Sequence, residues 1–212
     1  MECAICRTRR PRRFCPGVGG EICSLCCGTE REVTVECPLD CEFLREGRRH
    51  EKPAARNAAE FPNRDIQVPE KLLRANEHLL AFLSLTIFRS AMQVSGVVDG
   101  DVQEALDGLI RTYRTLESGV YYESRPNNLL AGSIYAAVWD ALAEFRSAEQ
   151  EELGLTKTRD ADVLGVLIFL QHFALNCDNG RRRGRAFLDA LREFHPPAQE
   201  PSGSSPSSAI LR

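Results

Sequence analysis

The first forty-one residues of this 212-residue chain hold eight of its nine cysteines. Several of them form pairs separated by two or three residues, and such a gap places both sulfurs of a pair on one tight turn. Sulfurs placed in this way can reach a tetrahedral zinc ion at about 2.3 Å. The eight candidate ligands are Cys3, Cys6, Cys15, Cys23, Cys26, Cys27, Cys37 and Cys41, enough for two ions with four thiolates each.

A segment of this length buries too little apolar surface to fold without a metal or disulfides. Disulfides would suit a secreted protein, but the chain starts without the apolar stretch of a secretory signal. It also contains no Asn-x-Ser/Thr glycosylation acceptor. We therefore expect a cytoplasmic protein whose thiols stay reduced and hold two structural Zn²⁺ ions.

Three short stretches of the segment share their spacing with a known zinc module. They are Cys3-Ala4-Ile5-Cys6, Arg13-Phe14-Cys15-Pro16 and Cys23-Ser24-Leu25-Cys26-Cys27. Together with a closing pair three residues apart, they resemble the HIT-type zinc finger, a treble-clef module with two interleaved zinc sites. The resemblance covers residues 1–45 and implies that Cys3, Cys6, Cys23 and Cys27 hold the first ion, and that Cys15, Cys37 and Cys41 belong to the second.

The sequence departs from this family at one ligand. A cysteine of the second site should stand at position 18, which is Val18 here. Cys26 is the obvious substitute because it is otherwise unassigned, although an exchange of Cys26 and Cys27 between the two ions fits the spacing equally well. His50 is a poorer fourth ligand because it lies well past the closing pair.

Two arginine clusters are candidate contacts for phosphate or for a partner. The first lies in one loop of the cysteine-rich segment, where guanidinium groups could also stabilise thiolates. The second lies between two predicted helices, where cations also favour the carbonyl end of a helix. The clusters are Arg7, Arg9, Arg10, Arg12 and Arg13, and Arg181, Arg182, Arg183 and Arg185, and they could form one surface if the two parts of the chain dock.

Composition limits the function of the whole chain. The formal net charge is −3, so neither bulk attraction to nucleic acid nor adsorption to a membrane surface is implied. The most apolar stretch, Val163 to Leu175, is too short to span a bilayer and is interrupted by Gln171 and His172. We expect a soluble protein.

Hydrophobic periodicity predicts a mainly α fold, with a small two-zinc treble-clef or cross-brace module followed by an all-helical domain. The expected domains are a zinc module at 1–47, a linker at 48–68, a helical domain at 69–195 and a disordered tail at 196–212. The linker could begin as a helix running from Cys41 to about Ala59, with a kink at Pro53. The helical domain should hold five helices, at about 69–96, 101–119, 128–149, 159–177 and 185–194.

No P-loop, nucleophile elbow or HExxH motif occurs, and all eight clustered thiols are needed for folding. We therefore expect a non-enzymatic, zinc-binding adaptor that contacts a protein partner through both domains, which is also what the HIT-type resemblance implies. A regulatory protein that binds RNA or DNA through the two arginine clusters is the alternative. An enzyme with a site in the helical domain is a second alternative, and it requires a deep pocket with convergent polar groups.

Overall fold

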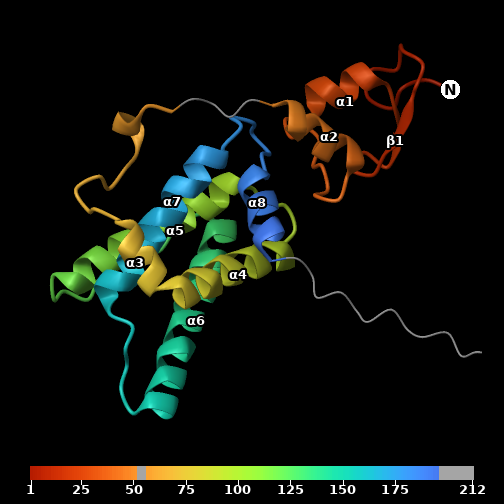
Figure 1. Cartoon of the computed structure of the whole chain (residues 1–212). Helices are drawn as coiled ribbons and strands as arrows, with labels where there is room; N and C mark the ends of the chain where they lie inside the picture. Colours follow the sequence, from red (N-terminus) through yellow and green to blue (C-terminus); the bar gives the residue numbers. More distant parts are fainter. Residues whose placement is uncertain (52–55, 196–212) are drawn as a thin grey trace, which may run out of the picture.

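The computed structural model describes residues 1–51 and 56–195, which form a mainly helical protein with a small N-terminal module (Figure 1). This part of the chain contains eight α-helices, one 3₁₀ turn and one two-stranded sheet. The predicted mainly α fold is confirmed. The expected kink at Pro53 and the expected disorder of 196–212 lie outside the described residues.

The N-terminal module is built from a β-hairpin and two helices. Strand β1 (Arg13–Cys15) pairs antiparallel with β2 (Gly20–Ile22), and Cys15 lies opposite Gly20. Helix α1 (Ser24–Glu30) follows directly, and α2 (Glu42–His50) ends the module. Helix α2 ends at His50, so the described part of the predicted 41–59 helix stops there.

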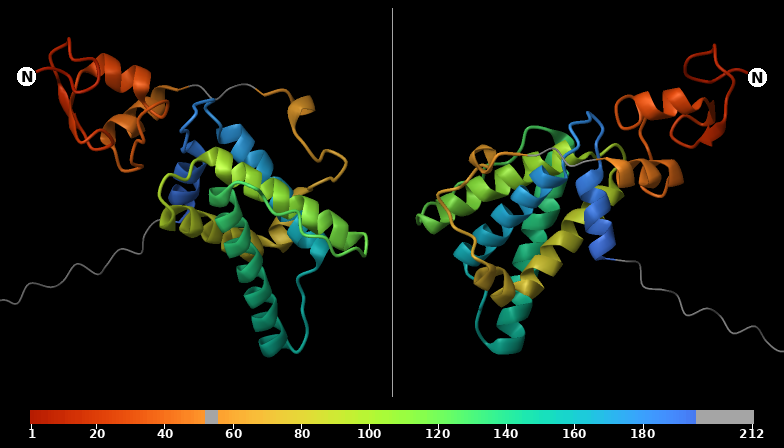
Figure 2. Two further views of the ribbon diagram at one scale, coloured as in Figure 1. Left: turned by 180° about the vertical axis from the view of Figure 1, so that it is seen from behind. Right: turned by 45° about the horizontal axis from the view of Figure 1, so that its top comes forward.

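The helical domain packs around α7, whose apolar residues are buried on several sides. Helix α5 contacts both α6 and α7, while α4 lies against α6 and α8 (Figure 2). The C-terminal end of α6 projects beyond the other helices in both views. The helices are α3 (Glu70–Ala75), α4 (Glu77–Gln93), α5 (Asp99–Glu117), α6 (Leu129–Leu153), α7 (Asp160–Cys177) and α8 (Ala186–Phe194).

The first predicted helix of this domain is divided into α3 and α4 at Asn76. The side-chain amide of Asn76 donates a 3.0 Å hydrogen bond to the carbonyl of Leu72, and the Asn76 backbone N–H also bonds to that carbonyl. An asparagine side chain that satisfies nearby backbone groups competes with helix continuation. The prediction of one helix over 69–96 is therefore wrong at this point, because apolar periodicity continues through the break.

The next helix begins two residues earlier than predicted. Asp101 lies inside the first turn, where its carboxylate accepts a 2.9 Å hydrogen bond from the Val98 N–H. The earlier start has a second consequence, because it places Asp99 against α8, where its carboxylate accepts hydrogen bonds from the N–H groups of Phe187 and Leu188.

Residues 56–68 lie against the helical domain through several polar contacts. A 3₁₀ turn spans Ala58–Glu60. Asn63 donates a 2.8 Å hydrogen bond to Gln171, and Arg114 pairs with Asp65 at 2.7 Å. His172 bonds to the carbonyl of Pro62, which is the hydrogen-bonded, structural role expected of a histidine on a mostly apolar helix.

One helix in the described part of the chain, α7, is long and apolar enough to cross a membrane by length and composition alone. Over half of that helix is buried inside the fold. Its apolar residues form the centre of the helical domain together with α5, so packing within the protein accounts for its composition.

Candidate metal centre

Four cysteine sulfurs converge in the N-terminal module. The sulfurs of Cys3, Cys6, Cys23 and Cys26 all lie within 4.8 Å of one another. A tetrahedral zinc ion with bonds of 2.3 Å would hold its sulfurs about 3.8 Å apart, so a small inward movement completes the coordination shell. The residues present therefore fit a metal ion, and four thiolates would leave no open coordination position.

The hairpin and α1 bring these sulfurs together. The N–H of Ala4 bonds to the carbonyl of Glu21, which holds the first cysteine pair beside β2. Cys23 precedes α1 as its N-cap, and its sulfur accepts a hydrogen bond from the N–H of Cys26 at 3.4 Å. The N–H of Cys23 in turn donates to the sulfur of Cys3 at 3.2 Å. Backbone N–H groups of this kind stabilise thiolates and orient them toward a cation.

The thiols of this cluster differ in acidity. Hydrogen bonds from Thr8, through its side chain and its backbone, and from the Arg9 N–H lower the pKa of Cys6 to about 5. Burial, followed by the neighbouring thiols, raises the pKa of Cys26 to about 12. Burial also opposes ionisation of Cys3, but the backbone N–H groups of Cys6, Cys23 and Ile5 outweigh it and the pKa is lowered. A divalent cation would displace the remaining protons, because zinc binds the thiolate form.

The structure selects between the two open assignments for the first ion. Cys26 is in the converging set and Cys27 is outside it, so the assignment of Cys27 that the family resemblance implies is wrong here. Cys26 is buried, whereas Cys27 is half-buried and accepts long hydrogen bonds from Arg13 and Arg31, at 3.8 and 3.9 Å. Consecutive helical residues point about 100° apart, which separates the two sulfurs.

The other cysteines of the module lie near one another without forming an equally compact set. Cys15, Cys37 and Cys41 surround one small apolar cluster that contains Leu44. Burial is the main cause that raises the pKa of Cys37, and the charges of Glu32, Cys15 and Cys41 add to it. Within residues 1–51 and 56–195, only the first set of sulfurs is mutually close enough to be counted as a metal cluster.

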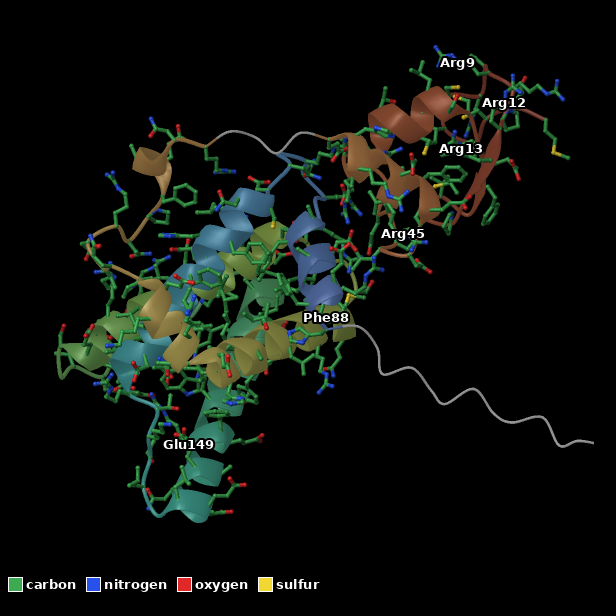
Figure 3. The ribbon with its side chains drawn as sticks, in the orientation of Figure 1. Arg9, Arg12, Arg13, Arg45, Phe88 and Glu149 are labelled. Carbon is green, nitrogen blue, oxygen red and sulfur yellow. The ribbon has the colours of Figure 1, made fainter. Side chains whose placement is uncertain are left out.

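Some arginines of the first cluster lie near the cysteines, and others are exposed on the surface. A hydrogen bond to the Cys23 side chain is the main cause that raises the pKa of Arg9, so this arginine is associated with the metal centre. Arg13 lies 3.9 Å from the ring of Phe43 and bonds to Cys27. Arg9 and Arg12 lie at the end of the module that points away from the helical domain (Figure 3). The exposed members of the cluster are Arg7, Arg9, Arg10 and Arg12.

Two side chains of the second arginine cluster, those of Arg181 and Arg183, pair with carboxylates of the N-terminal module. Arg181 pairs with Glu51 at 2.6 Å and lies 3.8 Å from Glu32, while Arg183 lies 3.4 Å from Glu36. Arg185 is buried, and its guanidinium contacts the sulfur of Met92 at 3.3 Å. Arg182 is exposed. The two clusters therefore do not form one surface.

Glu32 is the centre of this contact between the domains. Its side chain is fully buried and accepts hydrogen bonds from Arg48, from the amide of Asn179 and from the N–H of Arg185, the last two at 2.9 Å. Its carbonyl accepts a 2.7 Å hydrogen bond from the N–H of Arg183. We call Glu32 and the loop 179–185 that surrounds it the Glu32 socket.

Apolar packing accompanies the Glu32 socket. Leu39 belongs to the N-terminal module by sequence, yet it is buried in the same cluster as the core of the helical domain. Sequence reasoning missed Glu32, Arg48, Asp189 and Leu39 as docking residues. The sequence carries no local signal for them, because a single glutamate or leucine between cysteines has no periodicity that points to a distant loop.

No protein-family model, curated protein or solved structure matches this chain. The class of the protein therefore follows from its own geometry: a cysteine-rich metal-binding module docked on a helical domain.

Proposed function

We propose that the chain is a non-enzymatic, zinc-binding adaptor whose N-terminal module presents a surface to a protein partner. The observation that carries the proposal is the closed set of four sulfurs, which suits a structural ion because it offers no position for substrate. The inner side of the module is occupied by the Glu32 socket and by Leu39. Its remaining surface is therefore available to a partner.

Exposed apolar side chains on the module support a protein partner. Phe14 is 58% exposed and Leu25 is 51% exposed. Aromatic residues are enriched at protein interfaces, where a few well-packed side chains supply most of the binding energy. Val18 and Val33 are also exposed, and Val18 stands where the HIT-type family has a ligand.

We further propose that a second zinc ion binds Cys15, Cys27, Cys37 and Cys41, which would complete the two-zinc, HIT-type treble clef. Cys15, Cys37 and Cys41 pack around one cluster, and the Cys27 sulfur accepts long hydrogen bonds from Arg13 and Arg31. Binding would draw these sulfurs into the compact arrangement that the first set already has. Metal analysis of protein purified without chelator should find two zinc ions per chain, and one or fewer would contradict the second site.

The partner surface can be tested with two variants that leave the ligands in place. Phe14→Ser and Leu25→Ser should retain the zinc content of the wild type but lose a protein captured by the wild type from the native cell. Lys71→Ser, an exposed change on α3, is the matched control. Capture that survives both substitutions, or that disappears after nuclease treatment, would contradict a protein partner at this surface.

One specific observation favours the alternative function, binding of nucleic acid. Arg7, Arg10 and Arg12 are exposed and form no ion pair with any residue in the described ranges. If they contact phosphate, affinity for single-stranded RNA should fall steeply with salt, and replacing all three by Gln should reduce the slope of log K against log salt. The adaptor proposal expects no binding at about 0.15 M salt.

A further inference from the structure

The helical domain contains a cavity of about 300 Å³ where α4, α7 and α8 meet. Helix α4 contributes Glu77, Leu80, Ala81 and Ser84, which recur at the spacing of one helical face. This face extends for two turns, or about 10 Å. The cavity is at the lower end of the size range of small-molecule sites.

Aromatic rings form the opposite wall. Phe169 and Phe173 are stacked with their centroids 6.4 Å apart, and Phe194 meets Phe173 edge-on at 5.8 Å. Phe194 is 67% exposed, so part of this wall faces water. A ring or short alkyl group placed in the cavity would cover that surface.

The cavity has a polar group at each end, and the two groups differ in how much of their hydrogen-bonding capacity the chain itself uses. Ser84 Oγ lies 2.8 Å from His195 Nε2 and 3.0 Å from the carbonyl of Ala81. A serine hydroxyl has one proton, so donation to Ala81 leaves its oxygen to accept from His195 Nε2, and the Ser84 hydroxyl is satisfied within the chain. Glu77 at the other end is exposed at the mouth of the cavity and forms no hydrogen bond or ion pair with the chain as far as the structure describes it.

We propose that this cavity binds a small apolar amine, with its ammonium group at Glu77 and its apolar body against Phe169 and Phe173. Charge complementarity selects the ligand, because the carboxylate is the one lining group with unused acceptor capacity and a negative charge. The ring faces also favour a cation over an anion. This site is independent of the metal centre and of the surface proposed for a protein partner.

The proposal is tested with three probes of one size: 2-phenylethylamine, 2-phenylethanol and phenylacetate. Ligand-observed NMR titration of the full chain should show the amine binding about two- to fivefold more tightly than the alcohol, and phenylacetate most weakly. Glu77→Gln should lower the affinity for the amine to that for the alcohol and leave the alcohol unchanged. Ala81→Leu, which fills the cavity, should abolish binding of both.

Glu151→Gln is the control for general attraction of cations, because Glu151 is an exposed carboxylate on α6 that does not line the cavity. It should leave all three affinities unchanged. Equal binding of the three probes, a preference for the amine that survives Glu77→Gln, or no binding by any probe would each overturn the proposal.

Discussion

Glu32 and Arg185 are 153 residues apart in the sequence, yet the N–H of Arg185 donates a 2.9 Å hydrogen bond to the carboxylate of Glu32. Arg48 reinforces this link, because its guanidinium bonds both to Glu32 and to Asp189 on α8. Glu32 also has a backbone φ of 54°, in the left-handed region that non-glycine residues rarely occupy. A buried carboxylate held in this conformation by donors from two domains identifies the docking point of the N-terminal module.

Replacing Glu32 by Gln should separate the two domains. The substitution leaves Arg48 buried without its full set of acceptors, and loss of one member of a buried ion pair typically costs about 3–5 kcal/mol. Urea unfolding should show the loss of stability, and trypsin should cleave after Arg181 or Arg183 faster than in the wild type.

Glu36→Gln is the matched control for this experiment. Glu36 also faces the arginine loop, but both side chains of its pair with Arg183 are more than 40% exposed, and a pair of this kind contributes about 0–1 kcal/mol. Equal effects of the two substitutions would show that the burial of Glu32 is not what holds the domains together.

Cys26→Ser should remove the first metal ion. Its sulfur is one of the four that converge, and serine is a poor zinc ligand. Zinc analysis should find one ion fewer per chain than in the wild type, whereas Cys27→Ser should leave the first site intact. Cys177→Ser is the control, because this cysteine lies at the end of α7, far along the chain from the cluster. Retention of full metal content by Cys26→Ser would contradict the assignment.

Asp99 should make stability depend on pH. Burial is the main cause that raises its pKa from 3.8 to about 7, against the N–H groups of Phe187 and Leu188 that favour the charged form. Because the folded-state pKa lies above the unfolded value, the contribution is fully present below about pH 4 and is lost as pH rises through 7. The loss is at most about 4 kcal/mol.

Chemical denaturation between pH 5 and pH 8 measures this contribution. The free energy of unfolding of Asp99→Asn should fall less with rising pH than that of the wild type, since the amide carries no charge at any of these values. Asp140→Asn, an exposed change on α6, should follow the wild type. Parallel curves for Asp99→Asn and the wild type would show that Asp99 does not titrate in this range.

Two glycines of α5 should respond in opposite directions to alanine. A Cβ at Gly108 would lie 2.6 Å from the carbonyl oxygen of Ser124 and 3.2 Å from Tyr135, so Gly108→Ala should destabilise the protein by about 1–3 kcal/mol. A Cβ at Gly100 would meet nothing closer than 4.0 Å, and Gly100→Ala should be stabilising by about 0.5–1 kcal/mol. Thermal unfolding of the two variants compares them directly, and a change of the same sign in both would contradict the close approach at Gly108.

The helical class of the protein could be predicted from the sequence because it depends on local pattern. Apolar periodicity located the described helices from α5 to α8 within a few residues, and it failed at Asn76, where one side-chain amide ends a helix without interrupting the pattern. Spacing alone predicted that Cys3 and Cys6 lie together, since a short gap places both sulfurs on one turn, whereas the HIT-type resemblance implied that Cys23 joins them.

The choice between Cys26 and Cys27 required the tertiary structure. Both follow Cys23 within one helical turn, and only the direction in which α1 leaves the hairpin decides which sulfur faces the cluster. The contacts of loop 179–185 likewise could not be predicted from the sequence. Four arginines within five residues are plain in the sequence, but their engagement with Glu32 depends on a contact across 150 residues, which no local pattern encodes.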